Sequence, residues 1–178
     1  MFLAVAVTAQ VVMLCGFYLS WRATRLDRLH RRVETSQAAL AAALARRGTA
    51  MLALAGTAGC DSASARTLVD AVNTARRAGE DERELAESDL SRLLRETLEG
   101  AESTSFPDTL LAEVVDAAKR VHMARTFYND AVAHTRRARR SRLVRVLRLA
   151  GRASLPEFFE IDDEPPRPLS VPEDPGPR

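Results

Sequence analysis

An uncharged apolar run at the N-terminus limits what this chain can fold into more than any other feature. Residues 2–20 contain no charged side chain. A helix rises about 1.5 Å per residue, so a run of this length nearly spans the ~30 Å hydrocarbon core of a bilayer. Tyr18 and Trp21 lie where aromatic rings favour the headgroup level, and Arg22 follows directly. We therefore expect residues 1–20 to anchor the chain in a membrane.

A cleaved secretory signal peptide is the alternative interpretation of the same run. Such a peptide has a basic N-terminal region, a shorter apolar centre and a small-x-small cleavage site. Here no basic residue precedes the run, and Tyr18 and Trp21 make its end bulky. Cys15 follows Leu14, whereas a lipoprotein signal has a small residue before its cysteine. These features favour an uncleaved anchor.

Basic residues are distributed asymmetrically about the run. No Lys or Arg precedes it, whereas five arginines crowd its other flank: Arg22, Arg25, Arg28, Arg31 and Arg32. Lys and Arg accumulate on the cytoplasmic side of membrane spans. We expect a single-pass protein of the cell membrane, with its N-terminus outside and the remaining chain in the cytoplasm.

The composition of the remaining chain favours helices. Aromatic residues make up only 5% of the sequence. The core must therefore be built from Ala, Leu and Val, which suits closely packed helices better than a β-sandwich of bulky layers. The apolar residues 49–59 are too short for a second membrane span and are expected to form a buried face. A turn is expected at 59–62, where Asp or Ser can cap the next helix.

Three long helical stretches are expected after the anchor. The first runs from Trp21 without Pro or Gly until Gly48, so it could continue the membrane helix. The second is expected from near Ser64 to about Leu98, with Gly79 as a weak point. The third is the clearest, because its apolar residues recur every three or four positions, as in the seam of a helical bundle. These residues are Leu110, Val114, Ala117, Val121, Ala124, Tyr128 and Ala131.

These elements predict an all-α fold. Helices joined by short turns are usually antiparallel neighbours. We expect an N-terminal transmembrane helix followed by an antiparallel bundle of three long helices and a short basic C-terminal helix. The expected domain limits are 1–20 for the anchor, 21–161 for the bundle and 162–178 for a tail. The tail is dense in Pro and acidic residues and should be disordered.

Three parts of the chain resemble the LemA family. Residues 124–132 read ARTFYNDAV, which resembles the family's R-x-F/Y-Y-N-x-x-V block. Residues 32–47 resemble its first bundle helix, and LPEFFEI at 155–161 resembles its C-terminal P-x-F-E element. The chain departs from the family at 133–135, where a second Tyr-Asn pair is usual, and it lacks the following Phe-Pro turn. The resemblance implies a single-pass membrane protein with a cytoplasmic antiparallel bundle, from a family that has no established enzymatic activity.

The signature block supplies the first set of candidate site residues, namely Arg125, Phe127, Tyr128 and Asn129. Tyr128 falls on the predicted seam, so its ring would be buried and its hydroxyl hydrogen-bonded, while Asn129 would fix the helix register. Alternatively, the block forms a surface that binds a partner protein, since interface hot spots favour exposed aromatic residues.

The basic segment 138–151 supplies the second set. Its arginines recur every three residues, at Arg139, Arg142, Arg145 and Arg148. Such a helix can lie on anionic lipid, or it can be a fourth bundle helix with solvated arginines. Without interleaved aromatic residues it is not expected to bind nucleic acid. In an up-down-up bundle this end lies about 40 Å from the membrane, so a protein partner competes with lipid.

Nothing in the sequence is typical of catalysis or of a cofactor site. There is no glycine-rich phosphate loop, C-x-x-C or H-E-x-x-H pattern. His30, His122 and His134 are too widely spaced to suggest a metal triad. We expect a non-enzymatic protein without a cofactor that acts through an unidentified protein partner or lipid. A cleaved, exported bundle and a membrane-bound enzyme are the alternatives.

Overall fold

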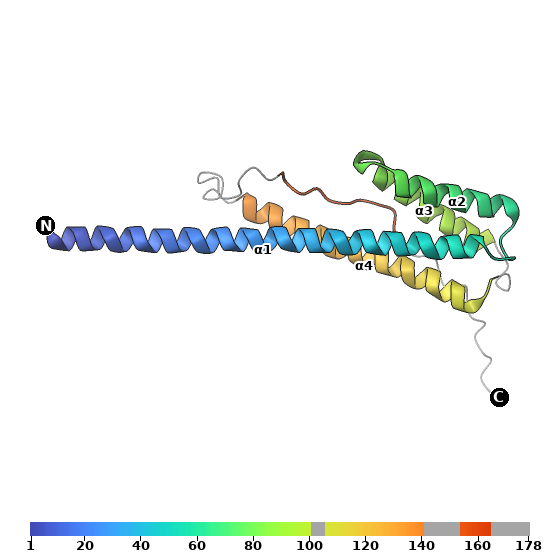
Figure 1. Ribbon diagram of the computed structural model, residues 1–178, viewed down its shortest axis with the longest axis horizontal. Coiled ribbons are helices and arrows are strands. Elements are labelled where there is room, and N and C mark those ends of the chain that lie inside the picture. The colour runs from blue at the N-terminus through green and yellow to red at the C-terminus, as the bar shows by residue number, and fades with distance from the viewer. Residues whose placement is uncertain (101–105, 141–153, 165–178) are drawn as a thin grey trace, which may run out of the picture. The chain divides into compact units, whose positions relative to one another are not determined.

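The computed structural model describes residues 1–100, 106–140 and 154–164. Within these ranges the chain is helical and has no strands, which confirms the all-α class for the described part (Figure 1). The helices are α1 (Phe2–Ala55), α2 (Ser62–Arg77), α3 (Glu80–Gly100) and α4 (Asp108–Arg139).

The chain divides into two compact units. The anchor unit comprises Met1–Gln37 with Phe127–Phe158, and the core unit comprises Ala38–Thr126 with Phe159–Arg178. Because the dividing points fall inside α1 and α4, each of these helices contributes one part to each unit.

Helix α1 begins with an apolar stretch that none of the described residues covers. It is the one helix in the described ranges that is long and apolar enough to cross a membrane, with a mean hydropathy of 2.1 over its best 18-residue window. None of that window is buried. The same helix continues through Gly48 without a break, as the sequence suggested.

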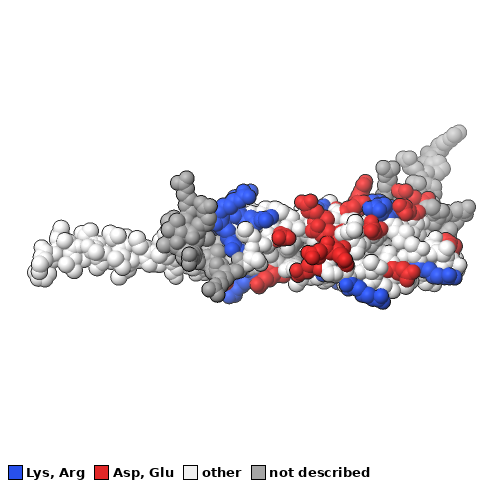
Figure 2. All heavy atoms as spheres, turned by 90° about the horizontal axis from the view of Figure 1, so that it is seen from above, with Lys and Arg blue, Asp and Glu red and all other residues white. Residues whose placement is uncertain are grey.

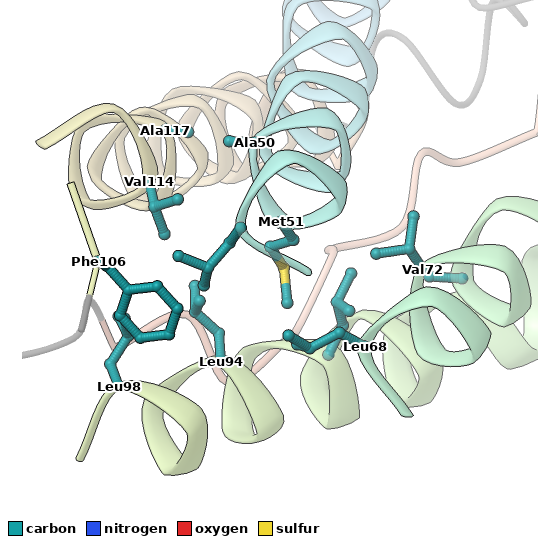
Figure 3. Close-up of a cluster of buried hydrophobic side chains, with 12 residues drawn as sticks. Ala50, Met51, Leu68, Val72, Leu94, Leu98, Phe106, Val114 and Ala117 are labelled. Carbon is teal, nitrogen blue, oxygen red and sulfur yellow. The ribbon is translucent and has the colours of Figure 1, made fainter. Parts of the chain in front are cut away.

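All four helices contribute to the apolar centre of the core unit (Figure 3). The expected burial within residues 49–59 is confirmed at Ala50, Met51 and Leu54, which are at most 2% exposed. Phe106, just before α4, lies beside Leu98 at the end of α3 (Figure 3). The other buried members are Leu68, Val72 and Ala75 from α2, Leu90 and Leu94 from α3, and Val114 and Ala117 from α4.

The single helix expected over residues 64–98 is wrong, because the chain reverses between α2 and α3. The two helices pack side by side as a hairpin (Figure 1). Ala78 ends α2 with ψ at 132°, outside the helical region. Three acidic residues then occupy the first turn of α3, where carboxylates interact favourably with the helix dipole. A straight 35-residue helix would extend about 50 Å, whereas the hairpin lets both apolar faces reach one core.

The turn expected at 59–62 is present and Asp61 caps the following helix. Its carboxylate accepts hydrogen bonds from the backbone N–H groups of Ala63 at 2.9 Å and Ser64 at 3.1 Å. A hydrogen bond from the Ser64 side chain lowers the pKa of the Asp61 carboxyl most, and the bonds from the backbone N–H groups of Ser64 and Ala63 lower it further. Since the cap satisfies N–H groups that the first turn leaves free, α2 begins at Ser62 rather than at Ser64.

The predicted seam of α4 has the correct phase. Five of its positions are buried, and Leu110 and Ala124 are partly buried. In the core unit these buried positions are Val114, Ala117 and Val121, and in the anchor unit they are Tyr128 and Ala131. The three- and four-residue spacing therefore identified the packed face of this helix.

In the anchor unit, the end of α4 packs beside α1. The Thr135 hydroxyl lies 3.5 Å from the carbonyl oxygen of Leu29, and Arg32 pairs with Asp130 at 3.6 Å. These two contacts show that α4 and α1 run in opposite directions within the anchor unit. The C-terminal end of α4 consequently points back toward the apolar run.

Residues 154–164 form an extended segment without helix. Asp162 and Asp163, the first residues of the expected tail, form ion pairs with helices of the core unit. The remaining tail, 165–178, lies outside the described residues. Most of the expected short basic helix, residues 141–153, also lies outside them.

Candidate functional site

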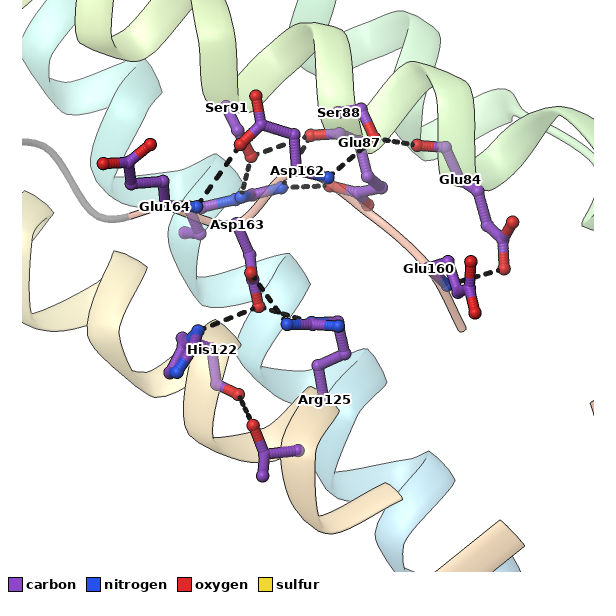
Figure 4. A network of polar contacts seen from close by, with 12 residues as sticks. Glu84, Glu87, Ser88, Ser91, His122, Arg125, Glu160, Asp162, Asp163 and Glu164 are labelled. Carbon is purple, nitrogen blue, oxygen red and sulfur yellow. Dashed lines mark hydrogen bonds and ion pairs between the residues drawn. The ribbon is translucent and has the colours of Figure 1, made fainter. Parts of the chain in front are cut away.

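Two candidate residues of the signature block, Arg125 and Tyr128, contact the C-terminal segment 154–164. In the core unit, Arg125 grips Asp163 with two hydrogen bonds, Nε to Oδ2 at 2.5 Å and Nη2 to Oδ1 at 3.0 Å (Figure 4). The Asp163 side chain is only 7% exposed, and His122 Nδ1 lies 3.3 Å from the same carboxylate. Two-pronged pairing of this kind fixes both position and orientation.

Helix α3 holds the same part of the segment from the other side. Arg95 donates to both carboxylate oxygens of Asp162, at 3.1 and 2.5 Å, and to the backbone carbonyl of Glu164 at 3.0 Å. The backbone N–H of Asp162 donates to Ser88 Oγ at 3.1 Å, and that of Glu160 to a Glu84 carboxylate oxygen at 2.9 Å (Figure 4). The Arg95 hydrogen bond lowers the pKa of the Asp162 carboxyl, and Asp162 raises the pKa of Arg95.

In the anchor unit, Tyr128 holds the earlier part of the segment. Tyr128 is 8% exposed, and its hydroxyl donates to the backbone carbonyl of Glu157 at 2.9 Å. The guanidinium of Arg136 lies 5.2 Å from the centre of the Phe158 ring, a cation–π contact. Arg139 donates to the carbonyl of Ser154 at 2.7 Å. The C-terminal part of α4 therefore contacts residues 154–158 at several positions.

The four signature residues thus differ in their surroundings. Arg125 and Tyr128 contact the C-terminal segment, each within its own unit. Asn129 is partly buried, whereas Phe127 is 66% exposed. Phe127 is therefore the member of the block whose side chain is most available to a partner.

The second candidate set is described only at its first member. Arg139 is partly buried at the end of α4, where it contacts the C-terminal segment. Arg142, Arg145 and Arg148 lie outside the described residues. Two neighbours of Arg139 that the sequence analysis did not select, Arg137 and Arg140, have exposed side chains.

Sequence reasoning missed a buried ion pair in the core unit. Arg47 Nη2 lies 2.6 Å from a Glu87 carboxylate oxygen, and its Nη1 lies 2.6 Å from Ser91 Oγ. The Arg47 and Glu87 side chains are only 2% and 6% exposed. A signal was available, because Glu87 and Ser91 share the three- and four-residue spacing of the buried leucines of α3.

The core unit contains a small cavity. A cavity of about 130 Å³ between α1, α2 and α3 is lined in part by Gly48, Arg83 and Glu87. Pockets for drug-sized ligands run to roughly 300–1,000 Å³, so this cavity is too small for one. No group of three His, Cys, Asp or Glu side chains in the described residues could hold a metal ion. Comparisons of the chain with protein-family models, with curated proteins and with solved structures find no match.

Proposed function

We propose that this protein is a single-pass membrane protein of the LemA type, whose cytoplasmic helical domain acts through contacts with protein or lipid. The observation that carries the proposal is the continuity of α1. Its first part is apolar and uncovered, and its last part supplies Met51 and Leu54 to the core. A signal peptide is removed by proteolysis and is not part of the mature fold. Here the apolar run belongs to the same helix that contributes side chains to the core.

The distribution of arginines supports a cytoplasmic domain. Five arginines lie within residues 22–32, directly after the apolar run, and none precedes it. Membrane spans with such an asymmetry in their flanking residues are usually oriented with the basic flank in the cytoplasm. In the proposed arrangement α1 leaves the membrane, and the later helices form an antiparallel bundle on its cytoplasmic part.

The contacts of the C-terminal segment support the LemA-type proposal. The resemblance rests on two stretches far apart in the sequence, 124–132 and 155–161. Tyr128 from the first bonds to Glu157 in the second within the anchor unit. Arg125 from the first bonds to Asp163, two residues beyond the second, within the core unit. In this proposal the signature block binds the C-terminal segment to the helices. The exposed side chain of Phe127 is then the residue of the block that contacts a protein partner.

The proposed activity is binding rather than catalysis. The buried carboxylates Glu87 and Asp163 are each paired with an arginine, so each buried charge has a partner within the fold. The proposal includes no cofactor and no nucleic acid, and its protein partner is defined only as one that contacts the helical domain.

A topology experiment tests the proposal. A green fluorescent protein fused after Arg178 should fluoresce in cells, and alkaline phosphatase fused at the same position should be inactive. The purified chain should retain residues 1–20 and show the full mass of 19.5 kDa. An active phosphatase fusion together with a mass lacking the first 20 or so residues would instead support an exported, signal-cleaved protein.

A further inference from the structure

The end of α4 lies near the level at which α1 leaves the apolar run. Thr135 neighbours Leu29, and the two helices run in opposite directions in the anchor unit. Arg140 lies five residues beyond Thr135, about 7.5 Å along the axis, and Trp21 lies eight residues before Leu29, about 12 Å. Arg140 is therefore within about 5 Å of the level of Trp21 along α1. This distance is shorter than the Debye length of about 8 Å at physiological salt.

Aromatic and basic side chains mark that level as a membrane interface. The rings of Tyr18 and Trp21 are 6.3 Å apart. The guanidinium of Arg22 lies 5.8 Å from the centre of the Tyr18 ring, and that of Arg25 lies 5.8 Å from the centre of the Trp21 ring. Trp and Tyr are enriched at the headgroup region of membranes, with Lys and Arg on the cytoplasmic side.

Positive charge accumulates around the same level. The described part of the anchor unit contains nine arginines and four acidic residues, a net charge of +5 with neutral histidines. Figure 2 shows Lys and Arg side chains gathered beside the uncharged N-terminal stretch. Arg28, Arg137 and Arg140 are exposed, and none is within ion-pair distance of a carboxylate in the described residues. Among the described residues, no neighbouring carboxylate therefore neutralises their charges.

We propose that Arg25, Arg28, Arg137 and Arg140 form one basic collar that binds anionic lipid headgroups of the bilayer spanned by α1. This inference rests on the proposed function, since it requires α1 in a membrane. The up-down-up arrangement expected from sequence argued against lipid contact, because it placed the basic end about 40 Å away. The contacts between α4 and α1 remove that objection. Phosphate oxygens of the headgroups would accept hydrogen bonds from the guanidinium groups.

The arginines at the end of α4 differ in whether they contact the C-terminal segment. Arg136 and Arg139 are partly buried and contact Phe158 and Ser154 of the C-terminal segment. Arg137 in the last turn of α4 and Arg140 directly after the helix have exposed side chains. The helix thus uses one pair of arginines internally and presents the other pair to its surroundings.

Quenching of Trp21 fluorescence tests the collar in the full-length protein. Trp21 is the one tryptophan of the chain. The protein is reconstituted in phosphatidylcholine–phosphatidylglycerol vesicles in which either lipid is brominated on its acyl chains. The ratio of the two quenching efficiencies reports enrichment of the anionic lipid around α1. We expect brominated phosphatidylglycerol to quench more strongly at 50 mM KCl, and the preference to decline at 500 mM.

The decisive variant is Arg137→Gln with Arg140→Gln. Each basic residue near an anionic surface raises affinity roughly fivefold, so this double variant should reduce the lipid preference at least about fivefold. Arg25→Gln with Arg28→Gln should have a similar effect. The matched control is Arg66→Gln with Arg77→Gln, which removes two exposed arginines of α2 in the core unit and should leave the preference unchanged.

The outcomes separate failure of the collar from failure of the proposed function. If both brominated lipids quench Trp21 equally in the wild-type protein, α1 is in the membrane and the collar is wrong. If the α1 double variant loses the preference while the α4 double variant keeps it, α4 does not contact lipid and the collar is also wrong. If neither lipid quenches Trp21, α1 does not span the bilayer and the proposed function itself fails.

Discussion

At the scale of single residues, arginine has two distinct roles in this protein. Arg47 is buried with Glu87 and Ser91, whereas Arg137 and Arg140 are exposed. A planar guanidinium can donate several hydrogen bonds in a fixed geometry, which helps to offset the cost of removing its charge from water. Three of the Arg47 hydrogen bonds go to α3, so this side chain also specifies how α1 and α3 pack.

We predict that Glu87→Leu strongly destabilises the protein. The variant leaves the Arg47 charge buried without its carboxylate, which typically costs about 3–5 kcal/mol. The double variant Arg47→Met with Glu87→Leu should recover most of the loss, because it removes both charges. Chemical unfolding of the full-length protein in detergent measures both. Asp116→Ala, which breaks the exposed pair with Arg120, is the control and should cost less than about 1 kcal/mol.

We predict that the ion pair of Arg95 with Asp162 contributes stability that acid removes. The hydrogen bond from Arg95 lowers the pKa of Asp162 in the folded state. Its contribution is therefore fully present above the unfolded pKa of about 3.9 and is lost as the pH falls through the folded-state pKa. Arg95→Gln should be less stable than wild type at pH 7 by up to about 1 kcal/mol, since solvent screens this partly exposed pair.

The measurement is urea unfolding of both proteins at pH 7 and below pH 3. The difference between wild type and Arg95→Gln should shrink toward zero in acid. Arg66→Gln, which removes an exposed arginine from α2, should differ little from wild type at either pH. A difference for Arg95→Gln that persists unchanged in acid would mean that Asp162 is not its important partner.

At the scale of helices, the sequence correctly predicts which face of α4 is buried. Val121 is fully buried and Lys119, two residues earlier, is exposed. We predict that Val121→Asp costs several kcal/mol, because it buries a charge without a partner. Lys119→Glu should change stability little. Thermal unfolding followed by circular dichroism compares them, and equal shifts in Tm would contradict the burial of this face.

The hairpin of α2 and α3 shows how packing overrides local helix propensity. Residues 64–98 have helical periodicity throughout and only one glycine before Leu98. Gly79 needs no left-handed backbone and has open space around it, so the reversal does not depend on a conformation that only glycine adopts. The reversal instead lets Leu68 and Val72 of α2 join Leu90 and Leu94 of α3 in one cluster. Burying each large apolar side chain contributes about 1.5–3 kcal/mol.

At the scale of the whole molecule, the apolar start of α1 determines how the protein behaves in solution. Its exposed side chains include Phe2, Leu3, Leu14 and Phe17, each more than half exposed. We predict that the full-length protein stays in the membrane pellet after alkaline carbonate extraction and dissolves in detergent. A chain lacking residues 1–20 should appear in the supernatant. Release of the full-length protein by carbonate would identify it as peripheral.

The sequence by itself determined the features that depend on neighbouring residues. The length and lack of charge of residues 2–20 identify a candidate span, because the thickness of a bilayer sets the number of residues needed to cross it. The spacing of Val114, Ala117 and Val121 identifies the buried face of α4, because helix geometry repeats every 3.6 residues. Both features follow from local geometry, so no distant contact is needed to predict them.

Only the tertiary structure decided which distant residues meet. Three examples are the hairpin of α2 and α3, the ion pair of Arg47 with Glu87 and the ion pair of Arg125 with Asp163. In each, the local sequence pattern around one partner does not indicate which distant residue it will contact. The segment 154–164 has no helical or strand pattern, and its place depends on arginines and hydroxyls of α3 and α4. Such pairings are selected by the free energy of the whole packed core, since burying a charge is tolerable only where a partner is already positioned.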